Sequence, residues 1–131
     1  MQLGYTILYV DDVPATLDAW KAAFGLTERF RTPEGDYGEL DTGSTTLSFA
    51  GRELGRSHFE QEDIRALFDG KAQMFEIGLI TDDVPGAYAK AVESGMRTVV
   101  EPITKPWGQV VGWVTDHNGI LIEIAAPMAQ G

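Results

Sequence analysis

The chain of 131 residues is long enough to bury one compact core, and 44% hydrophobic with 23% charged residues argues against wholesale disorder. A formal net charge of −10 disfavours nucleic-acid and anionic membrane partners, and it favours cationic small molecules. The absence of cysteine excludes disulfides, thiolate metal ligands and a thiol nucleophile.

The first ten residues, MQLGYTILYV, lack the basic start and the long apolar stretch of a signal peptide. No apolar run in the chain is long enough to span a bilayer. We therefore expect a soluble, cytoplasmic protein.

The first expected elements are a strand over residues 5–10 and a helix that follows it. The strand, YTILYV, is β-branched and aromatic. Asp11 and Asp12 fit a helix N-cap, Pro14 fits the first turn, and Gly25 fits a left-handed stop. Leu17, Trp20 and Phe24 share one face of this helix, and we assign Trp20 to the core. Three further strands are expected over residues 27–32, 37–41 and 45–49.

The same strand-to-helix junction recurs 71 residues later, where TDDVP repeats VDDVP. A strand is expected over residues 75–81, followed by a helix that opens at Asp82, Asp83 and Pro85 and ends at Gly95. Tyr88 lies on the buried face of this helix. Three more strands are expected over residues 98–104, 109–115 and 120–125. Each half is therefore predicted to be a βαβββ module.

A polar connector, residues 51–73, joins module 1–50 to module 74–127 within one domain of residues 1–131. Its DIRALF segment, residues 63–68, is expected to form one short helix. Its RELGRSHF segment is either a loop over a site or a linker, and we favour the linker.

Tandem βαβββ modules with DDVP helix openings, a late PWG and a closing DxxG-x-x-x-E resemble the vicinal oxygen chelate superfamily. This group includes glyoxalase I, extradiol dioxygenases, methylmalonyl-CoA epimerase and bleomycin-resistance proteins. The resemblance extends from Tyr5 to Ala126. It implies an α+β fold in which two curved mixed sheets enclose a concave site. Among the members of this group, the chain is most similar to the bleomycin-resistance proteins.

Metal-dependent members of that group take ligands from the first and last strand of each module. The resemblance maps these positions onto Tyr5, Glu76, Leu47 or Ser48, and Glu123. A transition metal requires several imidazoles, thiolates or carboxylates that converge. The chain has two histidines: His117 in a turn and His58 in the connector. We therefore expect no metal cofactor, and at most a weak divalent metal at Glu76 and Glu123.

Glu76 and Glu123 are expected to lie on neighbouring strands and to face each other. Alternation places Glu76 with Gly78 and Ile80, and Glu123 with Leu121, away from the helix. An apolar surrounding would raise a carboxyl pKa, which suits proton abstraction beside a carbonyl. The same pair suits a salt bridge to a cationic ligand, or a plain structural role.

Aromatic side chains make a ligand cage plausible beside these carboxylates. On the first strand, alternation turns Tyr5, Ile7 and Tyr9 to the concave face. Trp107 lies in the KPWG turn and Trp113 in the strand after it. Each tryptophan is expected either to bind ligand or to pack in the structure.

Two functional classes follow from these residues. The first is a non-catalytic binder that sequesters a small cationic or aromatic molecule, as in antibiotic resistance. The second is a lyase or isomerase that uses Glu76 and Glu123, with or without a weakly held metal. The missing ligands in the first module favour the binder. Members of the superfamily that the chain resembles commonly dimerise, and each sheet leaves open edges that a partner could cover. We therefore expect a homodimer.

Overall fold

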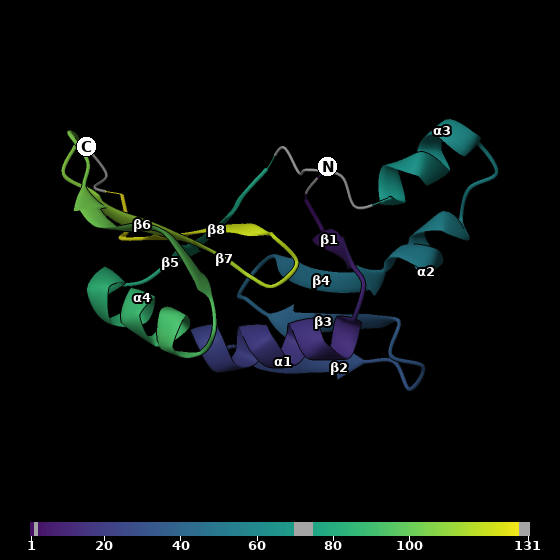
Figure 1. The fold of residues 1–131 in the computed structure, drawn as a ribbon, viewed down its shortest axis with the longest axis horizontal. Coiled ribbons are helices and arrows are strands. Elements are labelled where there is room, and N and C mark those ends of the chain that lie inside the picture. The colour runs from purple at the N-terminus through teal and green to yellow at the C-terminus, as the bar shows by residue number, and fades with distance from the viewer. Residues whose placement is uncertain (2, 70–74, 129–131) are drawn as a thin grey trace. The chain divides into compact units, whose positions relative to one another are not determined.

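The computed structural model describes residues 1, 3–69 and 75–128, and it consists of two compact units, each described by itself. The first unit contains β1 (Tyr5–Val10), α1 (Val13–Phe24) except its last three residues, β2 (Thr27–Arg31), β3 (Tyr37–Asp41), β4 (Thr46–Gly51), α2 (Arg52–Arg56), α3 (Glu62–Arg65) and the 3₁₀ helix η1 (Ala66–Phe68). The second contains β5 (Ile77–Ile80), α4 (Val84–Glu93), β6 (Arg97–Thr104), β7 (Val110–Thr115) and β8 (Leu121–Ala125). Each unit carries the predicted βαβββ order, and the fold is α+β (Figure 1).

Each unit holds one mixed sheet of four strands. The strand orders are β1-β4-β3-β2 and β5-β8-β7-β6. In both sheets the first and last strands of the unit pair in parallel, and the remaining pairs are antiparallel. The last strand therefore lies beside the first, as the two-module prediction requires.

Both helices begin where the sequence predicts, and α1 also ends at its predicted glycine. Asp12 caps α1 by accepting a hydrogen bond from the Ala15 N–H, and Gly25 ends it with a φ of 66°. Asp83 caps α4 in the same way, through the Gly86 N–H. Helix α4 ends one residue earlier than predicted, at the Ser94 cap, and Gly95 follows with a positive φ of 109°.

The core of each unit lies between its helix and one face of its sheet. In the first unit the fully buried Trp20 packs on Phe49 of β4, with ring centroids 5.0 Å apart. Gly38 lets Leu17 approach β3, because a side chain at that position would overlap the leucine. In the second unit Gly112 gives the same room to the buried Tyr88. The core assignments of Trp20 and Tyr88 are confirmed.

The second-unit edge strand is shorter than predicted. We expected a strand over residues 75–81, but pairing with β8 begins only at Ile77, opposite Ile122, and ends at Ile80. Glu76 therefore precedes the strand. In the first unit β4 extends to Gly51, one residue into the predicted connector.

The connector is more helical than the sequence predicts. The expected single helix over residues 63–68 is divided into α3 and η1, and the expected linker begins with helix α2. The buried Gly55 of α2 lies so close to the Phe68 ring that a side chain there would overlap it. Phe68 in turn packs edge-on against Tyr9 of β1, with centroids 4.6 Å apart. The apolar contact between Phe68 and β1 explains why the connector forms helices rather than an irregular loop.

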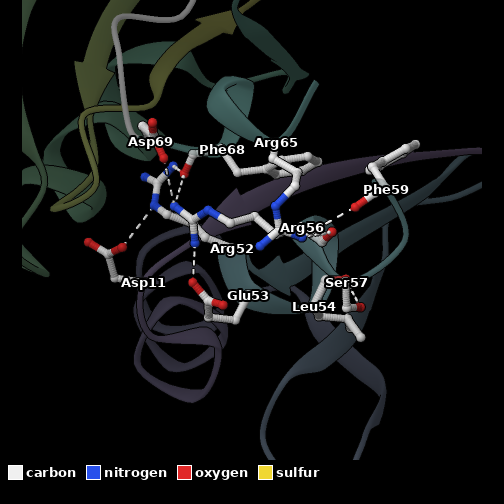
Figure 2. A network of polar contacts seen from close by, with 10 residues as sticks. All are labelled: Asp11, Arg52, Glu53, Leu54, Arg56, Ser57, Phe59, Arg65, Phe68 and Asp69. Atoms are coloured by element: carbon white, nitrogen blue, oxygen red, sulfur yellow. Dashed lines mark hydrogen bonds and ion pairs between the residues drawn. The ribbon is translucent and has the colours of Figure 1, made fainter. Parts of the chain in front are cut away.

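Arginines complete the connector's contacts (Figure 2). Arg52 Nε donates to Asp11 Oδ1 at 2.8 Å, which ties α2 to the start of the DDVP junction. Arg56 donates to the Phe68 carbonyl and to Asp69, both at 3.0 Å. These charges satisfy the carbonyl at the end of η1. No helix among the described residues is long and apolar enough to cross a membrane.

The salt bridges of Glu28 on β2 predict a loss of stability in acid. Arg31 and Lys21 hydrogen-bond the Glu28 carboxylate at 2.6–3.0 Å, and they lower its pKa from 4.5 to about 2. A depressed carboxyl pKa stabilises the fold above pH 4.5, and this stability is lost as the pH falls towards 2. We expect urea unfolding of Glu28→Gln to show a smaller fall in stability across that window than the wild type. Glu34→Gln, in an exposed turn, should keep the full fall; equal slopes in all three proteins would contradict the prediction.

Candidate functional site

The uncovered face of the second sheet brings Glu76, Trp113 and Glu123 together. Glu123 lies on the inner strand β8, opposite Gly78 of β5 on one side and Trp113 of β7 on the other. All three positions face away from the buried Ile122 and Ile124, as the alternation predicts. We call this group the Glu76–Trp113–Glu123 site.

The Trp113 indole crosses β8 to reach Glu76. Its Nε1–H donates to Glu76 Oε2 at 2.6 Å, although β7 and β5 are separated by β8. We expected Glu76 and Glu123 to face each other directly, but they do not. Gly78 occupies the position opposite Glu123, and Glu76 lies two residues before Gly78. The two carboxylates are instead diagonal neighbours on one face.

Burial raises the pKa of Glu123, and the negative charge of Glu76 raises it further. The Lys105 ammonium acts in the opposite direction. Lys105 Nζ lies 5.1 Å from the centroid of the Trp113 ring, which is a cation–π contact. Lys105 opens the KPWG turn and is a site residue that was not expected from the sequence.

Gly78 leaves open space beside Glu123. A Cβ at Gly78 would meet no heavy atom within 4 Å, and the residue is exposed. The surface over Gly78 is therefore free to receive a ligand group, with Glu123 on one side. The site therefore provides two carboxylates and one indole, the face of which binds a cation.

The other predicted contacts lie elsewhere. Tyr5, Ile7 and Tyr9 belong to the first sheet, on the face opposite Leu8 and Val10, as the alternation predicts. Tyr5 is exposed, whereas the Tyr9 ring packs against Phe68 of the connector.

Trp107 occupies a different part of the second unit. Its Nε1–H donates to Gln109 Oε1, and Gln109 in turn donates to the Ala126 carbonyl. It contributes to an open, largely apolar pocket of about 580 Å³ lined by residues 107–110 and 126–128. None of the three residues of the Glu76–Trp113–Glu123 site lines that pocket.

The family comparison agrees with this fold. A sequence model of the Glyoxalase/Bleomycin resistance protein/Dioxygenase superfamily matches residues 2–124. The chain belongs to this superfamily. No curated protein gives a match.

Solved structures share the fold at low identity. The chain is similar to a family enzyme from Burkholderia phytofirmans PsJN, with 19% identity, a TM-score of 0.82, and coverage of 96% of this chain and 98% of that one. A glyoxalase-related enzyme from Fulvimarina pelagi is 16% identical, with a TM-score of 0.80 and coverage of 97% and 88%. TioX from Micromonospora sp. ML1 is 20% identical, with a TM-score of 0.72 and coverage of 96% and 98%.

The residues at the superfamily's metal positions do not fit a complete metal site. Of the two candidates on β4, Ser48 lies on the open face and Leu47 on the helix-covered face, so Ser48 takes that position. Its hydroxyl is fully buried and hydrogen-bonded to Tyr37. Within the described residues no three His, Cys, Asp or Glu side chains converge. A transition metal requires three or four such ligands.

Both histidines are exposed. His58 is exposed after α2, and its ring lies edge-on to Phe59 at 6.3 Å. His117 is exposed in the turn between β7 and β8, where its neighbours Asp116 and Asn118 hydrogen-bond each other. The turn assignment of His117 therefore agrees with its surroundings.

The raised pKa of Glu123 predicts pH-dependent binding of cations. An ionised Glu123 attracts a cation and a protonated one does not, so affinity should be full above the raised pKa and fall below it. We expect the binding of benzyltrimethylammonium to weaken on acidification at a higher pH than an ordinary glutamate, with its pKa near 4.5, would require. Calorimetric dissociation constants from pH 4 to 8 measure this midpoint. In Glu123→Gln the midpoint should move to lower pH, and an unchanged midpoint would exclude Glu123 as its source.

Proposed function

We propose that the protein is a non-catalytic binder that sequesters a small organic cation, with Glu76, Trp113 and Glu123 as the residues that hold it. One observation carries the proposal: the chain's own Lys105 ammonium lies over the Trp113 ring, beside the two carboxylates. A ligand with an ammonium or amidinium group would find the same partners. An aromatic portion of that ligand would have the indole to stack on.

Charge and space support the same ligand class. The net charge of −10 attracts cations at long range, and the open surface over Gly78 admits a group larger than an ammonium. An antibiotic-like amine or guanidine has this chemistry. The proposal needs no metal cofactor.

A second candidate, a lyase or isomerase, is favoured by the raised pKa of Glu123. A carboxylate with a raised pKa is a stronger base than an ordinary glutamate. Glu123 would take a proton from the carbon beside a carbonyl, and the electron pair of the broken C–H bond would pass to the carbonyl oxygen as an enolate. Lys105 would then stabilise the enolate charge.

Replacing Lys105 separates the two candidates. If a ligand cation takes the place of Lys105, then Lys105→Met removes a competitor, and we expect the affinity for benzyltrimethylammonium to rise about three- to tenfold. The Trp113 indole N–H resonance, which reports the hydrogen bond to Glu76, provides the measurement by NMR titration. Lys90→Met, on the exposed side of α4, is the matched control for the lost charge and should bind as the wild type does. An affinity that stays equal or falls in Lys105→Met would contradict the cation binder.

The remaining predicted features belong to the same proposal. Tyr5, Ile7, Tyr9 and Trp107 are proposed as further ligand contacts. The protein is proposed to act in the cytoplasm, as a homodimer. Strands β1 and β2 of one sheet, and β5 and β6 of the other, are edge strands that such a dimer could cover.

A further inference from the structure

The first sheet carries a carboxylate on its uncovered face that the sequence analysis did not consider. Ile7, Ser48 and Glu39 stand in one row across β1, β4 and β3, and Phe30 of β2 continues that row. Their side chains lie opposite the face that α1 covers, since Phe49 and Leu40 alternate with them and are fully buried. Glu39 is therefore presented away from the core of the first unit.

Tyr37 fixes the position of the Glu39 carboxylate. The Tyr37 hydroxyl donates to Glu39 Oε2 at 2.6 Å and is hydrogen-bonded to the fully buried Ser48 Oγ at 3.0 Å. Burial, and then the hydrogen bond to Glu39, raise the pKa of Tyr37, so the phenol keeps its proton. One carboxylate oxygen is held by this contact, and the other is available to a ligand.

Glu39 also differs from the other acidic residues of its sheet. Glu28 is paired with Arg31 and Lys21, and Asp41 is paired with Arg29. In the described part of the chain, Glu39 forms no ion pair within 4.0 Å with any lysine or arginine. A half-buried carboxylate without an internal cation attracts an external one.

Two aromatic rings lie beside this carboxylate. Phe30 and Tyr37 lie with centroids 6.2 Å apart at an interplanar angle of 52°, which forms two tilted walls. Phe30 is 47% exposed, so its ring is accessible to a ligand. Ring faces together with a carboxylate are the groups that bind quaternary ammonium ions.

We propose that Glu39, Tyr37 and Phe30 form a second binding site, specific for a quaternary ammonium group, on the first unit. It is separate from the proposed Glu76–Trp113–Glu123 function and does not depend on it. A quaternary ammonium donates no hydrogen bond, so it is satisfied by the Glu39 charge and the ring faces alone.

The test is an NMR titration of the full chain with choline and with its neutral isostere, 3,3-dimethylbutan-1-ol. We expect choline to shift the backbone amides of Tyr37, Glu39 and Ser48, and the neutral alcohol to shift them far less. Glu39→Gln keeps an acceptor for the Tyr37 hydroxyl and removes the charge, so it should weaken choline binding about tenfold. Glu34→Gln, which removes an exposed charge from the β2–β3 turn, should leave it unchanged. Thermal melts of both variants establish that they are folded.

Three results would overturn the second site. They are equal shifts by choline and the neutral alcohol, wild-type choline affinity in Glu39→Gln, and loss of the first-unit shifts in the Glu76→Gln, Glu123→Gln double variant. The last result would mean that the first-unit face does not bind by itself. Loss of the Trp113 indole shift alone in that double variant concerns only the proposed function and supports the independence of the second site.

Discussion

Replacing Trp20 with alanine is expected to lower the free energy of unfolding by about 3–5 kcal/mol. Trp20 is fully buried between α1 and β4, where its ring packs against Phe49 at a centroid distance of 5.0 Å. Its removal would leave a cavity that the surrounding Leu17 and Phe49 cannot fill, because both belong to the same rigid core. Urea unfolding followed by far-UV circular dichroism measures the loss without relying on tryptophan fluorescence.

Trp107→Ala is the control for the loss of an indole. Trp107 is 63% exposed, and its polar contact is with Gln109 two residues away. We expect a change of about 0.5 kcal/mol or less. Similar losses in the two variants would show that the helix-to-sheet packing of the first unit is not what stabilises the chain.

Replacing both Glu76 and Glu123 with glutamine is expected to weaken benzyltrimethylammonium binding about thirtyfold, if each carboxylate contributes about 1 kcal/mol. Glutamine keeps an acceptor for the Trp113 Nε1–H, so the indole stays in place while the two negative charges are lost. NMR titration followed at the Trp113 indole N–H resonance at pH 7 gives the affinities of this site alone. The Glu93→Gln, Glu101→Gln double variant carries the same charge change on exposed parts of α4 and β6, and it should bind as the wild type does.

The same pair of proteins tests for a metal. Chelator-treated wild type is titrated with nickel, zinc, manganese and ferrous iron, and we expect no stoichiometric binding at micromolar concentration. Such binding in the wild type, lost in Glu76→Gln, Glu123→Gln, would contradict the cation binder and favour the lyase or isomerase.

The fold could be predicted because the sequence signals for its helix ends and strands are local and occur in both modules. An aspartate cap, a proline in the first turn and a following glycine mark each helix, and these groups act within a few residues of one another. Asp12 and Asp83 cap the helices through N–H groups three residues away. Strand alternation likewise placed Glu123 on the face away from the helix, whereas it was not used to place Trp113.

The contacts that define the site depend on register and on distant partners. The hydrogen bond from Trp113 to Glu76 crosses a strand and joins residues 37 apart in the sequence. In the connector, helix α2 is stabilised by Arg52 bonding to Asp11, 41 residues away. Neither of these two long-range hydrogen bonds can be predicted from the local secondary-structure propensity of the residues. Glu39 could have been found, because in YGELD it shares a face with Tyr37 and Asp41, but only the register with Ser48 shows that a hydroxyl lies beside it.

A substitution at Gly78 can change the space in the Glu76–Trp113–Glu123 site without changing the stability of the protein. The backbone there is ordinary strand rather than left-handed, and an added methyl group meets no neighbour. A larger side chain would therefore project over Glu123 without repacking the sheet. Ligand selectivity at this site can thus evolve, or be engineered, through one position that the fold itself leaves unconstrained.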